Sequence, residues 1–338
     1  MDYSLSQARP QEEEVEGGGG GGEVGSRCGK WVELPDDVMA SILRRLGTID
    51  ILANVERVCK TWRNICKEPS MWRSIDMRNL GNILDMEYDI VKICRHAVDR
   101  SSGALLQINI EYFGTDDLLL YIANRSTKLK SLRLVFCQNI SDEGLIAAAA
   151  KIPLLEELDL SYCSFSKVAL EEVGHCCPLL KSFKLNTAGY RHPRIESDDE
   201  ALAIAESMPR LHHLQMFGNK VTNHGLQAIL DGCPHLESLD VRQCFNVILE
   251  GQLGRRFSER IKDLRYPNDS TDDYPFDTRV PNITSSDEED YPSGFSDIDF
   301  MSDDGAYYDF SDGSNFTDDY YEGYDGWLDD VFMFYPGD

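Results

Sequence analysis

The chain has 338 residues, with 59 acidic residues, 33 basic residues and ten cysteines, and its formal net charge is −26. Most of the excess acid lies at the C-terminal end, because residues 270–338 hold 20 acidic residues and one arginine, whereas residues 31–269 hold 33 acidic and 29 basic residues. A nearly neutral central region argues against a general nucleic-acid-binding domain, which needs a basic face to displace counterions from phosphates.

Residues 1–30 are predicted to be disordered and to carry no targeting signal. They contain six consecutive glycines and few apolar side chains, so they cannot offset the entropy lost on ordering. A signal peptide needs a basic start and an apolar stretch, and a membrane span needs about 20 apolar residues. The sequence shows neither, so we expect no membrane association, a location in the nucleus or cytoplasm, and cysteines that stay reduced.

Residues 31–76 have the apolar spacing of a small helical domain. Val38, Ile42 and Leu46 recur every four residues, which predicts one helix. A second helical region is predicted by two adjoining apolar stripes, Ile51, Val55, Val58, Trp62 and Ile65 beside Leu52, Cys59 and Cys66. A segment shorter than 50 residues buries little surface by itself, so its surplus of apolar side chains suggests that a partner protein covers part of it.

Three spaced blocks in this segment resemble an F-box. They are Leu34-Pro35 with Ile42-Leu43-Arg44-Arg45-Leu46, then Val58-Cys59-Lys60-Thr61-Trp62-Arg63, then Met71-Trp72-Arg73. The resemblance implies a three-helix domain that binds a Skp-family adaptor, which joins it to a cullin–RING ubiquitin ligase. By the same resemblance, the adaptor-binding surface includes Leu34, Pro35, Ile42, Leu46, Val58, Cys59 and Trp62. The alternative is an ordinary helical bundle whose tryptophans form its core.

Residues 77–267 repeat a template with apolar residues at positions 1, 4 and 6 and a small or polar residue at position 9. Its copies begin at Leu105, Leu129, Leu155, Leu180, Leu211, Leu236 and Ile261, in steps of 24 to 31 residues. This period is the signature of leucine-rich repeats, and it is similar to the cysteine-containing repeat class of F-box proteins. It predicts an α/β solenoid of about seven repeats.

In each predicted strand, the residues between the template positions should face the concave side of the solenoid. Their charges alternate along the array, which suits a protein or peptide surface better than a polyanion. The residues expected to bind a substrate are Arg133, Asp159, Lys184, Gln215, Phe217, Asp240 and Arg242. Phe217 is the first choice among them, because its aromatic ring is expected to point outward from the strand.

Residues 268–338 are predicted to be a disordered acidic tail, because like charges at this density repel one another. The tail also contains 16 aromatic residues. Interleaved acids and aromatics resemble interaction segments that become ordered on a partner. A tail that only improves solubility is the equal alternative.

The sequence predicts neither catalysis, nor a cofactor, nor a metal. A nucleophile-elbow motif and a zinc-protease motif are both missing from it, and Trp31 stands where a phosphate-binding loop would need serine or threonine. Cys177 and Cys233 have histidines nearby, but Ile152 and Met208 occupy the same repeat position, which is typical of an apolar slot.

The predicted organisation is therefore α + α/β: a disordered segment (1–30), a three-helix F-box (31–76), leucine-rich repeats (77–267) and a disordered tail (268–338). By resemblance, the chain is expected to be the non-catalytic substrate-recognition subunit of an SCF (Skp–cullin–F-box) ubiquitin ligase. The acidic tail favours an alternative, a ligase-independent scaffold that binds basic proteins such as histones.

Overall fold

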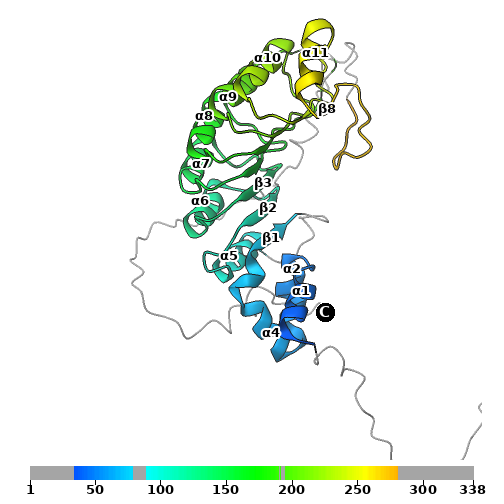
Figure 1. Cartoon of the computed structure of the whole chain (residues 1–338). Coiled ribbons are helices and arrows are strands. Elements are labelled where there is room, and N and C mark those ends of the chain that lie inside the picture. Colours follow the sequence, from blue (N-terminus) through cyan, green and yellow to red (C-terminus); the bar gives the residue numbers. More distant parts are fainter. Residues whose placement is uncertain (1–33, 79–88, 190, 192–194, 281–338) are drawn as a thin grey trace, which may run out of the picture.

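The structure is a computed structural model and describes residues 34–78, 89–189, 191 and 195–280. A group of N-terminal helices leads into a curved solenoid, in which strands line one side and helices line the other (Figure 1). The disorder predicted for residues 1–30, and for the tail beyond residue 280, concerns residues outside the described part of the chain.

Residues 34–72 form three helical segments, as the F-box resemblance implies, whereas the single apolar pattern from Ile51 to Cys66 is divided at Cys59. The first is α1 (Asp36–Leu43), the second is a continuous run of α2 (Thr48–Asp50), the π-helical η1 (Ile51–Val55) and α3 (Glu56–Val58), and the third is α4 (Lys60–Lys67) followed by the 3-10 turn η2 (Pro69–Trp72). Cys59 separates the last two segments, because its backbone is extended and its Sγ accepts a hydrogen bond from the Trp62 amide. The buried Trp72 indole donates to the Cys66 carbonyl at 2.7 Å.

Eight strands in the described residues form one parallel sheet in chain order. They are β1 (Ser74–Met77), β2 (Gln107–Glu111), β3 (Ser131–Val135), β4 (Glu157–Asp159), β5 (Ser182–Lys184), β6 (His213–Gln215), β7 (Ser238–Asp240) and β8 (Asp263–Arg265). The fourth template positions lie in one register, Ile108, Leu132, Leu158, Phe183, Leu214, Leu239 and Leu264. This register confirms the predicted repeat.

Helices alternate with the strands along the chain and lie on the convex side of the solenoid (Figure 1). These helices are α5 (Ile90–Arg100), α6 (Asp116–Arg125), α7 (Asp142–Ala149), α8 (Lys167–Cys176), α9 (Asp199–Ser207), α10 (Asn223–Gly232) and α11 (Gly251–Arg260). Ser141 and Thr222 accept hydrogen bonds from the first-turn amides of α7 and α10, which satisfies groups that a helix end leaves unpaired. In the described part of the chain, no helix combines the length and apolar character needed to cross a bilayer.

Two structural observations bear on the predicted boundaries. β1 spans the predicted boundary between residues 76 and 77 and pairs with β2, with Ile75 opposite Ile108. Thr48 of α2 accepts a hydrogen bond from the Asp76 amide of β1, so the N-terminal helices continue directly into the sheet. At the other end, residues 268–280 lie on the concave face, so the predicted disordered tail does not begin at residue 268.

Candidate binding surfaces

The N-terminal helices leave several large apolar side chains in solvent. Val38 and Ile42, one turn apart on α1, are 41% and 36% exposed, Leu46 is 43% exposed and Val58 is 59% exposed. The buried side chains of α1 are Met39 and Leu43. The apolar stripe that predicts the first helix therefore faces away from the core, which leaves it available to another molecule.

The other residues expected on the adaptor-binding surface border these exposed side chains. Pro35 precedes α1 and is exposed, whereas Leu34 is partly buried and packs against the core. Cys59 and Trp62 are half-buried, and the Trp62 ring also packs against the core. Trp62 therefore contributes to the fold as well as to the surface.

In the N-terminal half of the concave face, Arg133 lies between two carboxylates. Its Nη1 is 2.6 Å from Glu111 Oε1, and its Nε is 3.3 Å from Asp159 Oδ2. Arg133, Asp159 and the exposed Lys184 line a cavity of about 200 Å³ together with Asn109, Ser131, Leu132, Glu157, Leu158 and Ser182. The lining of this cavity carries side chains of both charge signs.

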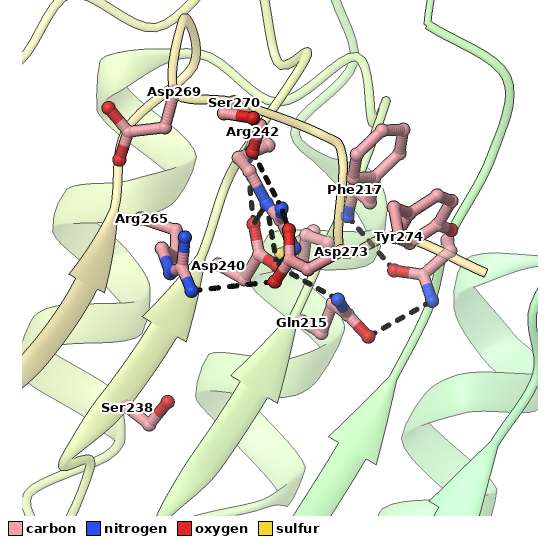
Figure 2. Close-up of polar contacts among 12 residues, drawn as sticks. Gln215, Phe217, Ser238, Asp240, Arg242, Arg265, Asp269, Ser270, Asp273 and Tyr274 are labelled. Atoms are coloured by element: carbon pink, nitrogen blue, oxygen red, sulfur yellow. Dashed lines mark hydrogen bonds and ion pairs between the residues drawn. The ribbon is translucent and has the colours of Figure 1, made fainter. Parts of the chain in front are cut away.

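In the C-terminal half, the candidate residues form a connected polar network (Figure 2). Gln215 Nε2 donates to Asp240 Oδ2 at 2.8 Å, and the Arg242 guanidinium donates to both oxygens of Asp240. Arg242 also donates to Asp273 and to the Ser270 carbonyl. These hydrogen bonds raise the pKa of Arg242 further above its usual range, so it remains a cation.

The prediction that Phe217 is available to a substrate is wrong for this structure. Phe217 is 1% exposed, because Tyr274 stacks on its ring with the centroids 3.8 Å apart (Figure 2). Arg242 and Asp240 are also buried, at 3% and 9% exposure. The segment 268–280 therefore covers the C-terminal half of the expected binding face. It also reaches Arg133, whose guanidinium carbon lies 5.9 Å from the centroid of the Phe276 ring.

Sequence reasoning missed a row of aromatic rings beside these strands. Tyr112, Phe136 and Tyr162 occupy position 8 of the first three repeats, and their rings stack with centroids 4.9 Å and 4.5 Å apart. The signal was present in the sequence, because the three residues recur at the same template position. The ring of Phe276, in the segment 268–280, packs edge-on against the rings of Phe136 and Tyr162.

The repeat cysteines behave as small apolar residues. Burial raises the pKa of the Cys163 and Cys177 thiols to about 12 and that of Cys137 to about 11, which makes thiolate chemistry unfavourable at neutral pH. Among the described residues, no group of three or more histidine, cysteine or acidic side chains could bind a metal ion.

Comparisons with known proteins agree with both halves of the chain. Residues 31–78 match the family model F-box-like, residues 106–199 match the model "FBD-associated F-box protein At5g56370, LRR repeats", and residues 208–230 match Leucine Rich repeat. "F-box protein SKIP19" of Arabidopsis thaliana is 54% identical over 85% of this chain and 92% of that protein. "Putative F-box/LRR-repeat protein 23" of the same plant is 57% identical over 72% of this chain and 54% of that protein.

Proposed function

Since the chain belongs to the F-box/leucine-rich-repeat family, we propose that it is a substrate-recognition subunit of an SCF-type ubiquitin ligase. In this proposal, the N-terminal helices bind a Skp-family adaptor, which connects the chain to a cullin–RING complex. The repeats bind a protein substrate. Proteins of this family are generally adaptors for substrates, and we propose that the chain contributes no catalytic group and acts in the nucleus or cytoplasm.

One observation carries the proposal: α1, the bend after it and α3 expose Val38, Ile42, Leu46 and Val58, while Met39 and Leu43 beside them are buried. Burying apolar area contributes roughly 25 cal/mol per Å², so an adaptor that covers these side chains gains affinity from each of them. Bound in this way, the chain raises the local concentration of substrate lysines near an activated ubiquitin.

The scaffold alternative gains no support from the comparisons, because the relatives that match are F-box proteins. The two functions also differ in what the tail does. Removing residues 281–338 leaves adaptor binding unchanged if the chain is a ligase subunit. In a histone-binding scaffold, the same deletion abolishes the main interaction.

The proposal is tested by co-purification of the full chain with a Skp-family adaptor. Val58→Asp introduces a charge into the proposed surface and should reduce adaptor binding at least tenfold. Val168→Asp is the matched control, because Val168 lies on α8 and is 61% exposed, against 59% for Val58. Ile42→Asp should behave like Val58→Asp. Equal adaptor binding by the wild type and both surface variants would overturn the proposal.

A further inference from the structure

The aromatic row on the concave face is built with strained backbone. Tyr112, Phe136 and Tyr162 have φ angles of 72°, 54° and 57°, a region that costs a residue with a side chain roughly 1–2 kcal/mol. Their amides donate to the carbonyls of Val135, Ser161 and Asn186 in the next repeats. The same strained conformation in three successive repeats places three rings in one stack at the surface.

A segment of the chain itself occupies one side of this row. Phe276 meets the rings of Phe136 and Tyr162 edge-on, with centroids 5.6 Å and 5.2 Å apart. Tyr274 stacks on Phe217, and its hydroxyl lies 3.2 Å from that of Tyr162. The two aromatic side chains of the segment therefore fill the space between the aromatic row and Phe217.

Polar contacts fix the same segment at both ends. Asp273 pairs with Arg242 and with Arg265, whose Nη2 lies 3.4 Å from it, and Arg242 lowers the pKa of Asp273. Gln243 donates from its amide to the Pro267 carbonyl at 2.8 Å and from its side chain to the Thr278 carbonyl at 2.7 Å. Among these contacts, Arg242 and Arg265 recognise the side chain of Asp273, whereas Gln243 binds backbone carbonyls; Tyr274 and Phe276 are held by the ring contacts described above.

The segment is bound as a short peptide would be, and not as a further repeat. After β8 it turns back along the side of the sheet opposite the helices (Figure 1), and it adds no strand to the sheet. Asp272, Pro275 and Asp277 remain exposed, while Tyr274 is buried. Its contacts come from few side chains, so another peptide with the same side chains can replace it.

We propose that this face is a binding site for an acidic–aromatic peptide and that residues 268–280 occupy it as an internal competitor. The partner is a protein segment with the order Asp-Tyr-x-aromatic, which matches Asp273, Tyr274 and Phe276. The proposal rests on the proposed function, in which the concave face binds the substrate, and it adds the class of segment that the substrate presents. A substrate segment can then bind to this face only after residues 268–280 leave it.

The test uses the full chain and a fluorescent synthetic peptide with the sequence of residues 268–280. Tyr274→Ala/Phe276→Ala in the chain removes the internal rings and should tighten peptide binding at least tenfold, measured by fluorescence anisotropy. Asp273→Lys is a second variant that should release residues 268–280 from this face. It places a third cation beside Arg242 and Arg265 while both aromatic rings of the segment remain. Tyr266→Ala is the control, since Tyr266 is an exposed tyrosine at the start of the same turn.

Specificity is tested with a second peptide in which both aromatic residues are alanine, and it should bind the opened chain at least tenfold more weakly. Equal affinity of the wild-type and both opened chains for the first peptide overturns the proposal. So does failure of a folded, opened chain to bind that peptide. Adaptor capture is measured in parallel, so loss of adaptor capture with intact peptide binding rejects the proposed function and not this site.

Discussion

Glu56 of α3 and Arg100 of α5 form an ion pair between the F-box and the helix that precedes the first repeat, with Arg100 Nη2 3.3 Å from Glu56 Oε2. The two side chains are 3% and 16% exposed. Among the described residues, the second atoms of the pair, Glu56 Oε1 and Arg100 Nη1, have no hydrogen-bond partner. Burial raises the pKa of Glu56 although Arg100 opposes the shift. The cost of removing both charges from water offsets much of their attraction, so the pair fixes how the two helices meet but contributes little net stability.

Removing only the cation of this pair should destabilise the chain. Arg100→Met leaves the buried Glu56 carboxylate without its partner, and we expect a loss of roughly 2–4 kcal/mol in the free energy of unfolding. Glu56→Gln/Arg100→Met should recover at least half of that loss, because no charge remains buried. Urea denaturation at pH 7.5 measures both values, with Glu56→Gln as the single-variant control. Equal loss in the single and double variants would contradict the ion-pair argument.

The buried His96 on α5 should lower the free energy of unfolding as the pH falls. The side chain is buried and accepts a hydrogen bond from Arg100 Nε at 3.2 Å. Burial, and then the charge of Arg100, lower the pKa of His96 from an ordinary 6.5 to about 4, while Asp99 has a smaller opposing effect. Between pH 6.5 and 4 the unfolded chain therefore binds a proton that the folded chain does not. Stability from this group is complete above pH 6.5 and falls as the pH drops.

The size of this effect can be measured with a variant that does not titrate. His96→Gln keeps a hydrogen-bond acceptor for Arg100 and removes the proton equilibrium. Between pH 7.5 and 4.5, the wild type should lose about 2–3 kcal/mol more unfolding free energy than His96→Gln. Urea denaturation at a series of pH values tests this. Parallel pH profiles for the two chains would show that His96 is not responsible.

The repeat could be predicted from the sequence because its period specifies both faces of every strand. Leu158 and Leu239 are buried at their expected positions, and Arg133 and Lys184 lie on the concave side. The core side of α1 could not be predicted in this way. Val38 and Ile42 share one face and Met39 and Leu43 share the other, so apolar spacing alone does not distinguish the core from a binding surface.

The burial of Phe217 was also beyond sequence reasoning, for a different reason. Its direction follows from strand alternation, but its cover comes from Tyr274, which lies 57 positions later in an acidic stretch. The contact between Tyr162 and Tyr274 joins residues 112 positions apart. Periodicity reports on neighbours in the same element, and it has no information on such long-range contacts.

Asn186 should stabilise the concave face through its hydrogen bonds, although its side chain carries no charge. It is buried, its Nδ2 donates to Ser161 Oγ at 2.8 Å, and its Oδ1 accepts from the Phe217 amide at 3.0 Å. Asn186→Ala leaves that amide unpaired, at a cost of about 1–3 kcal/mol in unfolding free energy. Asn139→Ala, at an exposed asparagine, should change stability by about 0.5 kcal/mol or less. Thermal and urea denaturation compare the two variants, and equal effects would refute the network.

Cysteine labelling should distinguish the core from the proposed adaptor-binding surface. Cys59 and Cys176 are half-buried, whereas Cys66, Cys94 and the repeat cysteines 137, 163, 177, 233 and 244 are buried. Burial raises the pKa of Cys66 and Cys94 to about 12, so these thiols should resist iodoacetamide in the folded chain at pH 8. Peptide mass spectrometry should find label at Cys59 and Cys176 before it appears at the buried positions.

Addition of the Skp-family adaptor should affect these two half-buried cysteines differently. Cys59 lies next to Val58 at the proposed interface, so a bound adaptor should slow its labelling at least fivefold. Cys176 ends α8 on the convex side of the repeats, and its labelling rate should not change. In the Val58→Asp chain, the adaptor should protect neither cysteine. Equal protection of Cys59 and Cys176 would place the adaptor elsewhere, and protection of Cys176 alone would move the interface from the helices of residues 34–72 to the convex face of the solenoid.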